Sequence, residues 1–438
     1  MGRLSENVLR RTIWGKTFFL ALFFSFMSCK GISGNAGNNG THSDNSKDLL
    51  FVDTFFVTTD KEIIIKKKVD LGGKLFRLTK NVNVVFEGGC FSNGSIEGFN
   101  NKIRNCTGKP VFDNIKIKGE WRVDTIKTSL FANLCDVNSL KDVFALCNPR
   151  ISNVVEIEPG NYILSVSKNG EACLPVSDNT ELILNGKLKL LPNEFPNYQI
   201  IRANGANIII RGNGSIRGEA DEHLKATGEW GMGIMVSRGH NVEIRDLKIS
   251  NCWGDCIYIG DKSKNIIIEG CILKKSRRQG ISITSADSVT IRKCQIDNIG
   301  GTSPGYAIDV EPNRGDSVNN VQIEQVRSND CMGTFLVNGY AEEAFVGNVT
   351  INNATAISDK KISVRVMKCD NIRVTNCNIY CSNPNEQVVF QDVREVVTKQ
   401  NEFGFIEQTD RRNVDKIKNG ARVKTKPQFK NCIIFRDE

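Results

Sequence analysis

Three consecutive segments of the chain share one template: NVEIRDLKISNCWGDCIYIGDKSK (residues 241–264), NIIIEGCILKKSRRQGISITSAD (265–287) and SVTIRKCQIDNIGGTSPGYAIDVEPN (288–313). Each begins with a short run in which apolar and polar residues alternate, and a second such run follows half a segment later. The segments begin 24 and 23 residues apart (265 − 241 and 288 − 265). A repeat of this length, built from β-branched residues, indicates a solenoid of stacked strand–turn units.

The same opening recurs on both sides of this stretch. Its first residues are Asn207, Asn241, Asn265, Ser288, Asn320, Asn348 and Asn371. The intervals are 34, 24, 23, 32, 28 and 23 residues, and the longer ones contain the insertions GEADEHLKATGEWGMG (218–233) and GGTSPG (300–305). Insertions in a solenoid project as loops from one rim, so we expect them to wall a groove beside the central turns.

The composition agrees with an all-β chain. Of 438 residues, 40% are apolar, 24% are charged and only 8% are aromatic, and 38 are glycine. This balance is typical of short strands joined by tight turns, where Gly and Asn tolerate positive φ.

One region departs from the strand period. Apolar residues between 129 and 148 fall three and four positions apart, which predicts a helix over about 136–147 with Asp136 or Ser139 as its N-cap. Such a helix would cover the open first turn of the solenoid. We therefore expect an N-terminal β region at 49–128, the β-helix domain at 129–438, and a cover segment at about 399–438.

The first residues are typical of a targeting segment. Four basic residues precede a 12-residue apolar run (17–28) that is too short to span a bilayer, and Cys29 follows it directly. This arrangement resembles the lipobox of a bacterial lipoprotein, which implies acylation of Cys29, and plain cleavage and secretion is the alternative. Residues 1–29 are then a signal, residues 30–48 a flexible tether, and the protein an outer-membrane lipoprotein or a periplasmic or secreted protein of a Gram-negative bacterium.

The charge balance is mildly basic. The formal net charge is +9, and removal of residues 1–29 leaves +6 (54 − 48). A surplus of this size fits an anionic polymer such as a polyuronate, or a basic surface without a specific partner. The chain has no Lys/Arg stripe interleaved with aromatic residues, so nucleic acid is not expected as a partner. Membrane contact is expected only through a lipid on Cys29.

Fifteen cysteines invite a disulfide interpretation. Cys271, Cys294 and Cys377, however, each lie six residues after the first residue of their turn, so we expect them to stack as a buried ladder of free thiols. The cysteine spacings do not match a zinc site and no His lies near them, so no metal is expected.

The chain resembles the pectin-lyase-like superfamily over residues 49–438. The resemblance rests on the length of the repeat, the short strand runs in each repeat, and the asparagines at the turns between strands. That resemblance implies a single right-handed parallel β-helix. Hydrolases, lyases, epimerases and phage tailspikes share this scaffold, so the resemblance alone leaves the chemistry open.

Alternation within the strands predicts which side chains face outward. The expected surface patch comprises Trp253, Asp255, Tyr258, Arg278, Gln279, Tyr306, Asp309 and Glu311. Carboxylates could perform acid/base catalysis, a guanidinium could bind a carboxylate substituent, and aromatic rings could stack on sugars. We expect Asp255, Asp309 and Glu311 to be catalytic and the other five residues to bind a polysaccharide.

Two of the segments are similar to motifs of polygalacturonase-type glycoside hydrolases. NCWGDCIYIG resembles G-D-D-C-I-A-I and RRQGISITS resembles G-H-G-I-S-I-G-S. Asp255 then matches the second aspartate of the family's general-acid/base pair. Gly254 stands in the place of the first aspartate, Gln279 replaces the histidine, and YAIDVEP occupies the place of the R-I-K strand. Asp255 and Asp309 lie two rungs apart, so we expect a separation of roughly 9.5 Å between them. That separation leaves room for a water molecule, as in an inverting hydrolase, here one acting on a uronate-containing glycan.

Two alternatives remain open. Tyr306-Ala-Ile-Asp309-Val-Glu311 is similar to the Y-G-F-D-P-H signature of alginate C5-epimerases, which implies a lyase or epimerase with Tyr306 as base. Arg278 or a cation such as Ca²⁺ would then neutralise the uronate; otherwise no cofactor is expected. The other alternative is a non-catalytic, tailspike-like glycan-binding β-helix. His223, in the first insertion, could also reach the groove.

Overall fold

The structure is a computed structural model that describes residues 51–52, 55–56, 61–134, 139–359, 364–382, 388–407 and 421–435. The chain divides into two units, Met1–Asp48 and Leu49–Glu438. The predicted signal with Cys29, the predicted tether and parts of the predicted cover segment lie outside the described residues.

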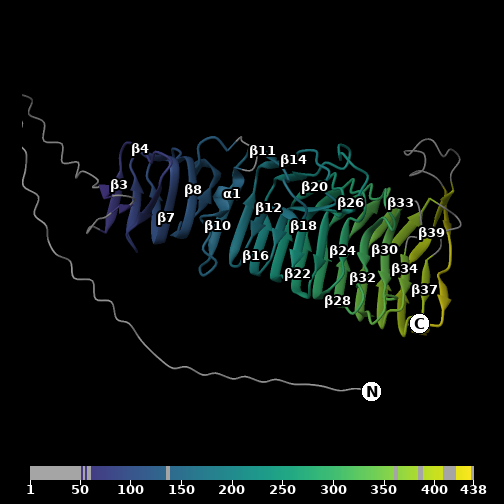
Figure 1. Ribbon diagram of the computed structural model, residues 1–438. Coiled ribbons are helices and arrows are strands. Elements are labelled where there is room, and N and C mark those ends of the chain that lie inside the picture. The colour runs from purple at the N-terminus through teal and green to yellow at the C-terminus, as the bar shows by residue number, and fades with distance from the viewer. Residues whose placement is uncertain are drawn as a thin grey trace, which may run out of the picture. The chain divides into compact units, whose positions relative to one another are not determined.

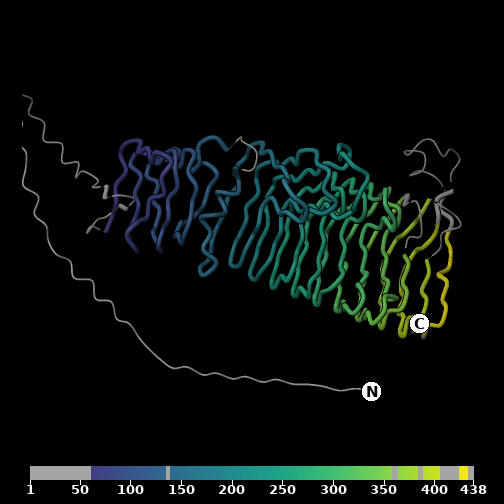
Figure 2. Tube along the Cα trace, viewed as in Figure 1, coloured from purple at the N-terminus to yellow at the C-terminus, as the bar shows by residue number. Residues whose placement is uncertain are grey.

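The second unit is built from coils that each add one strand to three parallel sheets, called B, C and D below (Figure 1). Successive coils run side by side along the tube in Figure 2. Sheet B contains β9 (Ile126–Lys127), β10 (Asn153–Ile157), β13 (Thr180–Leu184), β16 (Ala206–Arg211), β19 (His240–Arg245), β22 (Ser263–Glu269), β25 (Ala286–Arg292), β28 (Ser317–Glu324), β31 (Phe345–Val346), β32 (Asn348–Asn352), β35 (Asn371–Thr375), β38 (Glu395–Lys399) and β42 (Ile433–Phe435).

Sheets C and D have the same parallel order. Sheet C contains β11 (Asn161–Leu164), β14 (Lys187–Leu190), β17 (Ser215–Arg217), β20 (Lys248–Ser250), β23 (Ile272–Lys274), β26 (Gln295–Asp297), β29 (Arg327–Asn329), β33 (Thr355–Asp359), β36 (Asn378–Cys381), β39 (Glu402–Glu407) and, antiparallel at its end, β40 (Ala421–Lys424). Sheet D contains β12 (Glu171–Val176), β15 (Asn197–Ala203), β18 (Trp230–Ser237), β21 (Ile257–Gly260), β24 (Ile281–Ile283), β27 (Tyr306–Val310), β30 (Gly333–Asn338), β34 (Val364–Met367), β37 (Val389–Gln391) and β41 (Gln428–Lys430).

Strand pairing follows the predicted repeat. Val242 pairs with Ile266, and Ile266 pairs with Val289, which gives the offsets of 24 and 23 residues. The neighbouring offsets of 34, 32, 28 and 23 residues also hold. The inward residues of each coil are buried, and one continuous core extends from Ile63 to Phe403. Burial of each such side chain contributes about 1.5–3 kcal/mol, so the stack itself supplies most of the stability.

Asparagine side chains connect neighbouring coils at the start of the sheet B strands. Nδ2 of Asn207, Asn241 and Asn265 donates to Oδ1 of the asparagine one coil earlier, at 3.0–3.1 Å. All three residues adopt φ of 55–56°, a left-handed conformation that Asn tolerates better than other side chains. This asparagine ladder explains why Asn recurs at these positions.

The predicted burial of the three cysteines as free thiols is confirmed. Cys271, Cys294 and Cys377 are free thiols with almost no exposed surface. Burial also raises the pKa of the Cys377 thiol to about 11, which keeps it protonated and unreactive at neutral pH.

The region before residue 129 forms the first coils, in an eight-stranded sheet A. Its strands are β1 (Phe51–Val52), β2 (Phe55–Phe56), β3 (Glu62–Ile65), β4 (Lys68–Asp70), β5 (Leu75–Leu78), β6 (Asn83–Phe86), β7 (Cys90–Asn105) and β8 (Phe112–Arg122). Apart from β1 and β2, which pair antiparallel, its strands pair in parallel as in the later sheets.

The predicted helix is shorter than expected. Only α1 (Leu140–Phe144) is α-helical, with Ser139 as its N-cap, and residues 135–138 lie outside the described ranges. Upstream of it, a 3₁₀ turn (Thr128–Leu130) leads back to the coil before, where the Val111 N–H donates to the Leu130 carbonyl. Leu130, which lies before the predicted helix, therefore pairs with the preceding coil, and α1 ends at Phe144, three residues before the predicted end at 147. Within the described ranges no helix is long and apolar enough to cross a membrane.

Candidate active site

Three adjacent strands of sheet D bring most of the predicted site residues together. In β21, β24 and β27, Tyr258 pairs with Ser282, and Ser282 pairs with Asp309. Their Cα–Cβ bonds point to the side of the sheet opposite Ile281, Ile283 and the rest of the core. The three repeats of the sequence thus supply successive rungs of one surface.

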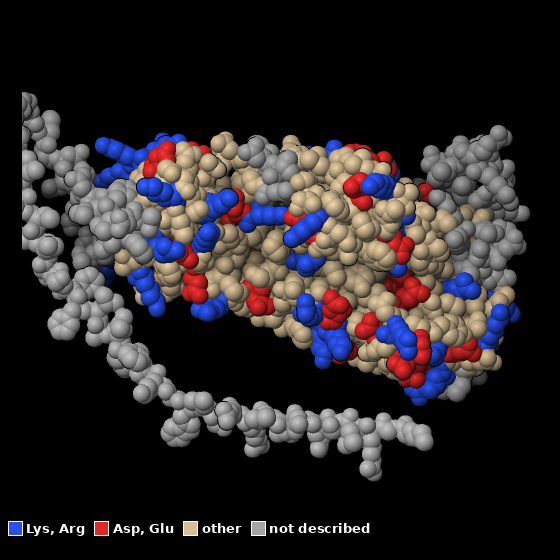
Figure 3. All heavy atoms as spheres, viewed as in Figure 1, with Lys and Arg blue, Asp and Glu red and all other residues tan. Residues whose placement is uncertain are grey.

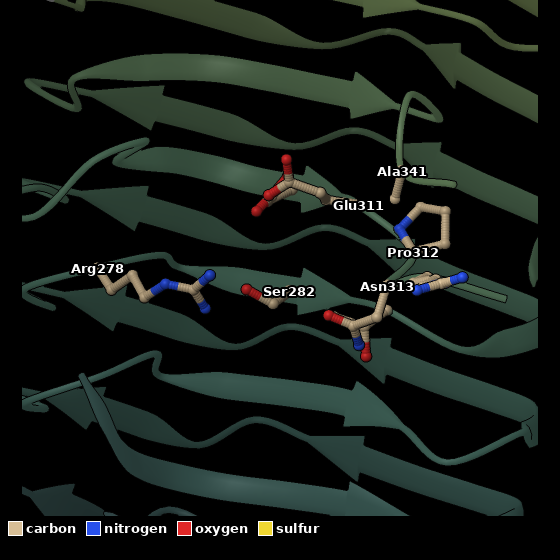
Figure 4. Close-up of a pocket in the computed structure, with 9 residues that line it drawn as sticks. Arg278, Ser282, Glu311, Pro312, Asn313 and Ala341 are labelled. Atoms are coloured by element: carbon tan, nitrogen blue, oxygen red, sulfur yellow. The ribbon is translucent and has the colours of Figure 1, made fainter. Parts of the chain in front are cut away.

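A cavity of about 270 Å³ opens on this surface. It is lined by Arg278, Ser282, Thr284, Asp309, Glu311, Pro312, Asn313, Arg314 and Ala341. In the close-up, the guanidinium of Arg278 points toward Ser282 from one side, and Asn313 lies on the other side (Figure 4). The cavity therefore joins two guanidinium groups, Arg278 and Arg314, to two carboxyl groups, Asp309 and Glu311.

Asp255 lies beneath this surface with no exposed area, although we had expected it in an exposed patch. Its Oδ1 accepts from the Gln279 backbone N–H at 3.0 Å, and its Oδ2 accepts from Arg278 Nη1 at 3.3 Å. Burial raises the pKa of Asp255 to about 6, and Arg278 opposes that shift. Asp255 is therefore largely ionised at neutral pH and does not line the cavity.

Asp309 is also buried, at 2% exposure, which corrects the expectation that it faces solvent. Its Oδ2 accepts from Gln279 Nε2 at 2.9 Å, and its Oδ1 has no hydrogen-bond partner. Burial, and then the charge of Glu311, hold the pKa of Asp309 well above its usual range. Asp309 lies on the wall of the cavity and holds its proton to a higher pH than an exposed aspartate does.

Arg278 and Glu311 surround this carboxyl. Burial disfavours the charge on Arg278, but Asp255 and then Glu229 outweigh burial and raise the pKa of the guanidinium. Its Nε lies 3.9 Å from Glu229 and makes no hydrogen bond. Glu311 is half-buried and its Oε1 accepts from Asn338 Nδ2 at 2.7 Å. The site thus places the Arg278 guanidinium and the half-buried carboxyl group of Glu311 beside Asp309.

Trp253 is not the exposed platform that we expected. It is 8% exposed, the ring of His223 stacks on it with centroids 3.8 Å apart, and the guanidinium of Arg277 lies 3.7 Å from its centroid. His223 Nδ1 in turn lies 3.2 Å from Oε1 of the buried Glu219. The first insertion therefore uses His223 to fix itself onto the coil, and the His223 side chain does not reach the cavity.

Gln279 and Tyr306 are buried as well, against the expectation that they face the substrate. Gln279 has no exposed surface, and its Oε1 accepts from the Tyr306 backbone N–H at 2.6 Å. Tyr306 is 5% exposed because its ring lies flat against Gly333, where a Cβ would come within 2.3 Å of it. Tyr258 is half-buried and its hydroxyl lies 2.7 Å from Thr284 Oγ1. None of these three residues lines the cavity.

Sequence reasoning missed several lining residues. Ser282 lies in β24 and Thr284 follows that strand, and neither was among the residues expected in the site. Pro312, Asn313 and Arg314 follow Glu311 directly, in a Pro-Asn-Arg-Gly turn after a strand that already carried two acidic residues. The position of this turn, directly after a strand with two acidic residues, could have indicated that its side chains belong to the site.

On the face seen in Figure 3, the described residues form no large patch of one charge. Lys/Arg and Asp/Glu side chains are interspersed over the face in Figure 3. Among the residues that the structure describes, no group of three or more His, Cys, Asp or Glu side chains is arranged to hold a metal ion.

Carboxyl groups held in different environments beside a guanidinium can do acid/base chemistry. Where environments push the pKa values of two carboxyls apart, one can donate a proton and the other can accept one. Asp309 has the environment of the acid, and Asp255, with a pKa of about 6, that of the anion.

Comparison with known proteins supports the fold. The family described as "right handed beta helix region" matches residues 192–349 and 232–406. Together with the parallel stacks, this match confirms the right-handed parallel β-helix predicted from the repeat.

Curated relatives match parts of the chain. The Bacillus subtilis (strain 168) protein YclG, described as uncharacterized, is 33% identical over 180 residues, which cover 35% of this chain and 31% of the relative. An Arabidopsis thaliana exopolygalacturonase, clone GBGA483, is 26% identical over 173 residues, which cover 34% of this chain and 38% of the relative. The chain thus spans about a third of the length of these relatives.

Among solved structures, the Family 28 exopolygalacturonase of Yersinia enterocolitica resembles the chain with a TM-score of 0.47 and 12% identity. The match covers 72% of this chain and 78% of that one.

Proposed function

We propose that this right-handed parallel β-helix protein is a glycoside hydrolase that cleaves an acidic, uronate-containing polysaccharide in the cavity on sheet D. Asp309 is the general acid, Glu311 is the general base, and Arg278 binds the carboxylate of a uronate. Asp255 acts from below as the buried counter-ion of Arg278.

One observation carries the proposal: the buried Asp309 lines the cavity, and its Oδ1 has no partner within the protein. Buried polar atoms are nearly always hydrogen-bonded, and an exception on a cavity wall suits a group whose partner arrives with the substrate. Because the pKa of Asp309 is raised, its carboxyl can keep the proton that a departing glycosidic oxygen requires.

The guanidinium groups favour an acidic substrate. Arg278 and Arg314 both line the cavity, and Arg278 Nε is buried without a hydrogen bond. A planar guanidinium binds a carboxylate through two parallel hydrogen bonds, which a neutral sugar does not offer. The name of the Arabidopsis relative, an exopolygalacturonase, agrees with this substrate class.

Asp309 lies in β27 and Glu311 directly follows that strand, two residues later on the same side of the chain. The separation of their carboxyl groups with substrate bound decides the stereochemical outcome, since inverting hydrolases need about 6.5–9.5 Å and retaining enzymes about 5–5.5 Å. The alternative with Tyr306 as the base of a lyase or epimerase loses support, because that side chain is buried outside the cavity.

Assays of purified protein on acidic and neutral glycans test the proposal. We expect new reducing ends from an acidic glycan without the ultraviolet absorbance of an unsaturated uronate. Asp309→Asn should lower kcat by about 10²–10⁴-fold, the usual contribution of a positioned acid. Arg278→Lys should mainly raise KM for acidic substrates, because a lysine lacks the guanidinium fork.

Asp124→Asn is the matched control, because that side chain is 84% exposed and lies outside the cavity. Unsaturated products would favour a lyase. Glycan binding that survives with no turnover in any glycan would favour the non-catalytic alternative.

We also propose that the protein is exported and anchored by acylation of Cys29. The apolar run followed directly by Cys29 supports this placement. Wild-type protein expressed in a Gram-negative host should incorporate labelled fatty acid and partition into detergent, and Cys29→Ala should do neither. Incorporation of the label by the Cys29→Ala variant would refute the anchor.

A further inference from the structure

Gln279 touches both buried carboxyls of the site. Its backbone N–H donates to Asp255 Oδ1 at 3.0 Å, and its side-chain Nε2 donates to Asp309 Oδ2 at 2.9 Å. The residue lies on the rung between them, has no exposed surface, and its carbonyl lies 2.6 Å from Ser276 Oγ. It is therefore held rigidly between Asp255 and Asp309.

The orientation of the Gln279 amide is fixed by chemistry. The Tyr306 backbone N–H, 2.6 Å away, can only donate, so the atom that faces it must be the amide oxygen. The amide nitrogen then necessarily faces Asp309.

An N–H that points at Oδ2 decides where a proton on Asp309 resides. The carbonyl oxygen of a carboxylic acid accepts a hydrogen bond better than its hydroxyl oxygen does, so Oδ2 becomes the carbonyl. The hydroxyl then forms at Oδ1, the atom that has no partner.

We propose that Gln279 is a positioning residue that places the proton of Asp309 on Oδ1, the oxygen without a partner in the protein, and holds Asp255 as an anion. One residue thereby keeps the two carboxyls in opposite protonation states. The catalytic consequence rests on the hydrolase function proposed above; the position of the proton does not.

Infrared difference spectroscopy tests the position of the proton without any substrate. Wild-type protein at neutral pH should show a carboxylic-acid carbonyl band that Asp309→Asn lacks. Gln279→Met, which keeps the length of the side chain but removes its N–H, should shift that band to higher frequency, because the carbonyl at Oδ2 loses its donor. No band in the wild type, or a band that does not move in Gln279→Met, would overturn the proposal.

Kinetics test the consequence. Gln279→Glu keeps an acceptor for the Tyr306 N–H and, at pH values where the new carboxyl is ionised, has no donor for Asp309, so it serves if Gln279→Met does not fold. We expect kcat to fall by about 10²-fold with KM nearly unchanged, and the alkaline limb of the pH–rate profile to move to higher pH. A wild-type kcat and pH profile in this variant would contradict a positioning role.

Gln199→Glu is the matched control, because Gln199 is a buried glutamine on the same sheet, in β15, outside the cavity. It should leave the pH profile in place. If the wild type cleaves no glycan, the hydrolase proposal fails, while the infrared experiment still decides the position of the proton.

Discussion

Asp309 links the fold to the chemistry at the scale of a single residue. The strand period correctly directs it away from the core, toward the side where Ser282 pairs with it. Its burial comes from neighbours on adjacent rungs and from the turn after Glu311, which line the same cavity. A buried acid with one unpartnered oxygen is unfavourable for folding when it ionises, and this cost can be measured.

Unfolding free energy should fall as pH rises, because the folded state holds protons that the unfolded chain has released. The unfolded carboxyl has a pKa of about 3.9, and burial raises the pKa of Asp309 well above that value. The contribution of Asp309 is complete below about pH 3.9 and is lost as pH rises through the raised pKa, by at most about 1.4 kcal/mol per pH unit. Asp255 adds the same trend up to its pKa of about 6.

Asp309→Asn should therefore gain stability relative to the wild type as pH increases, and differ from it little at acidic pH. Denaturant titrations at acidic, neutral and alkaline pH measure the difference. The exposed control Asp124→Asn should run parallel to the wild type. Parallel curves for Asp309→Asn would mean that Asp309 keeps an ordinary pKa.

The asparagine ladder is the element that joins neighbouring coils outside the core. Asn241 donates to Asn207, accepts from Asn265, and has φ of 56°. The ladder therefore combines two amide hydrogen bonds with a backbone conformation that most side chains disfavour.

Two substitutions separate these contributions. Asn241→Gly loses the amide and keeps the left-handed backbone, and Asn241→Ala loses both. We expect the alanine variant to be less stable than the glycine variant by about 1–2 kcal/mol, the cost of a Cβ in that conformation. Denaturant midpoints with an unchanged slope measure the difference. Equal stability of the two variants would show that the backbone conformation carries no weight.

Elements that depend on contacts between distant residues were harder to predict than the ladder. Leu130 belongs to the apolar residues spaced three and four positions apart, but its carbonyl accepts from Val111 of the preceding coil. The aromatic ring of Trp253 seemed available to a sugar, but His223 from a 16-residue insertion covers it. Neither contact leaves a local signal in the sequence.

For the whole molecule, the repeat was sufficient to predict the stacking. The pairing offsets around Val242 and Ile266 follow from positions counted in the sequence, because each coil binds only its neighbours. The same counting placed Asp255, Asp309 and Arg278 near one another. The repeat could not predict how deeply each outward side chain is buried. Alternation along a strand distinguishes the two faces of a sheet but does not show which other residues cover a face.

A crystal structure of Asp309→Asn with a uronate oligosaccharide tests the central claim most directly. We predict that the sugar lies in the cavity on sheet D, with a carboxylate paired to Arg278 and a glycosidic oxygen within hydrogen-bond distance of the side chain at position 309. An oligosaccharide bound elsewhere on the solenoid, or one whose carboxylates turn away from Arg278, would contradict the account.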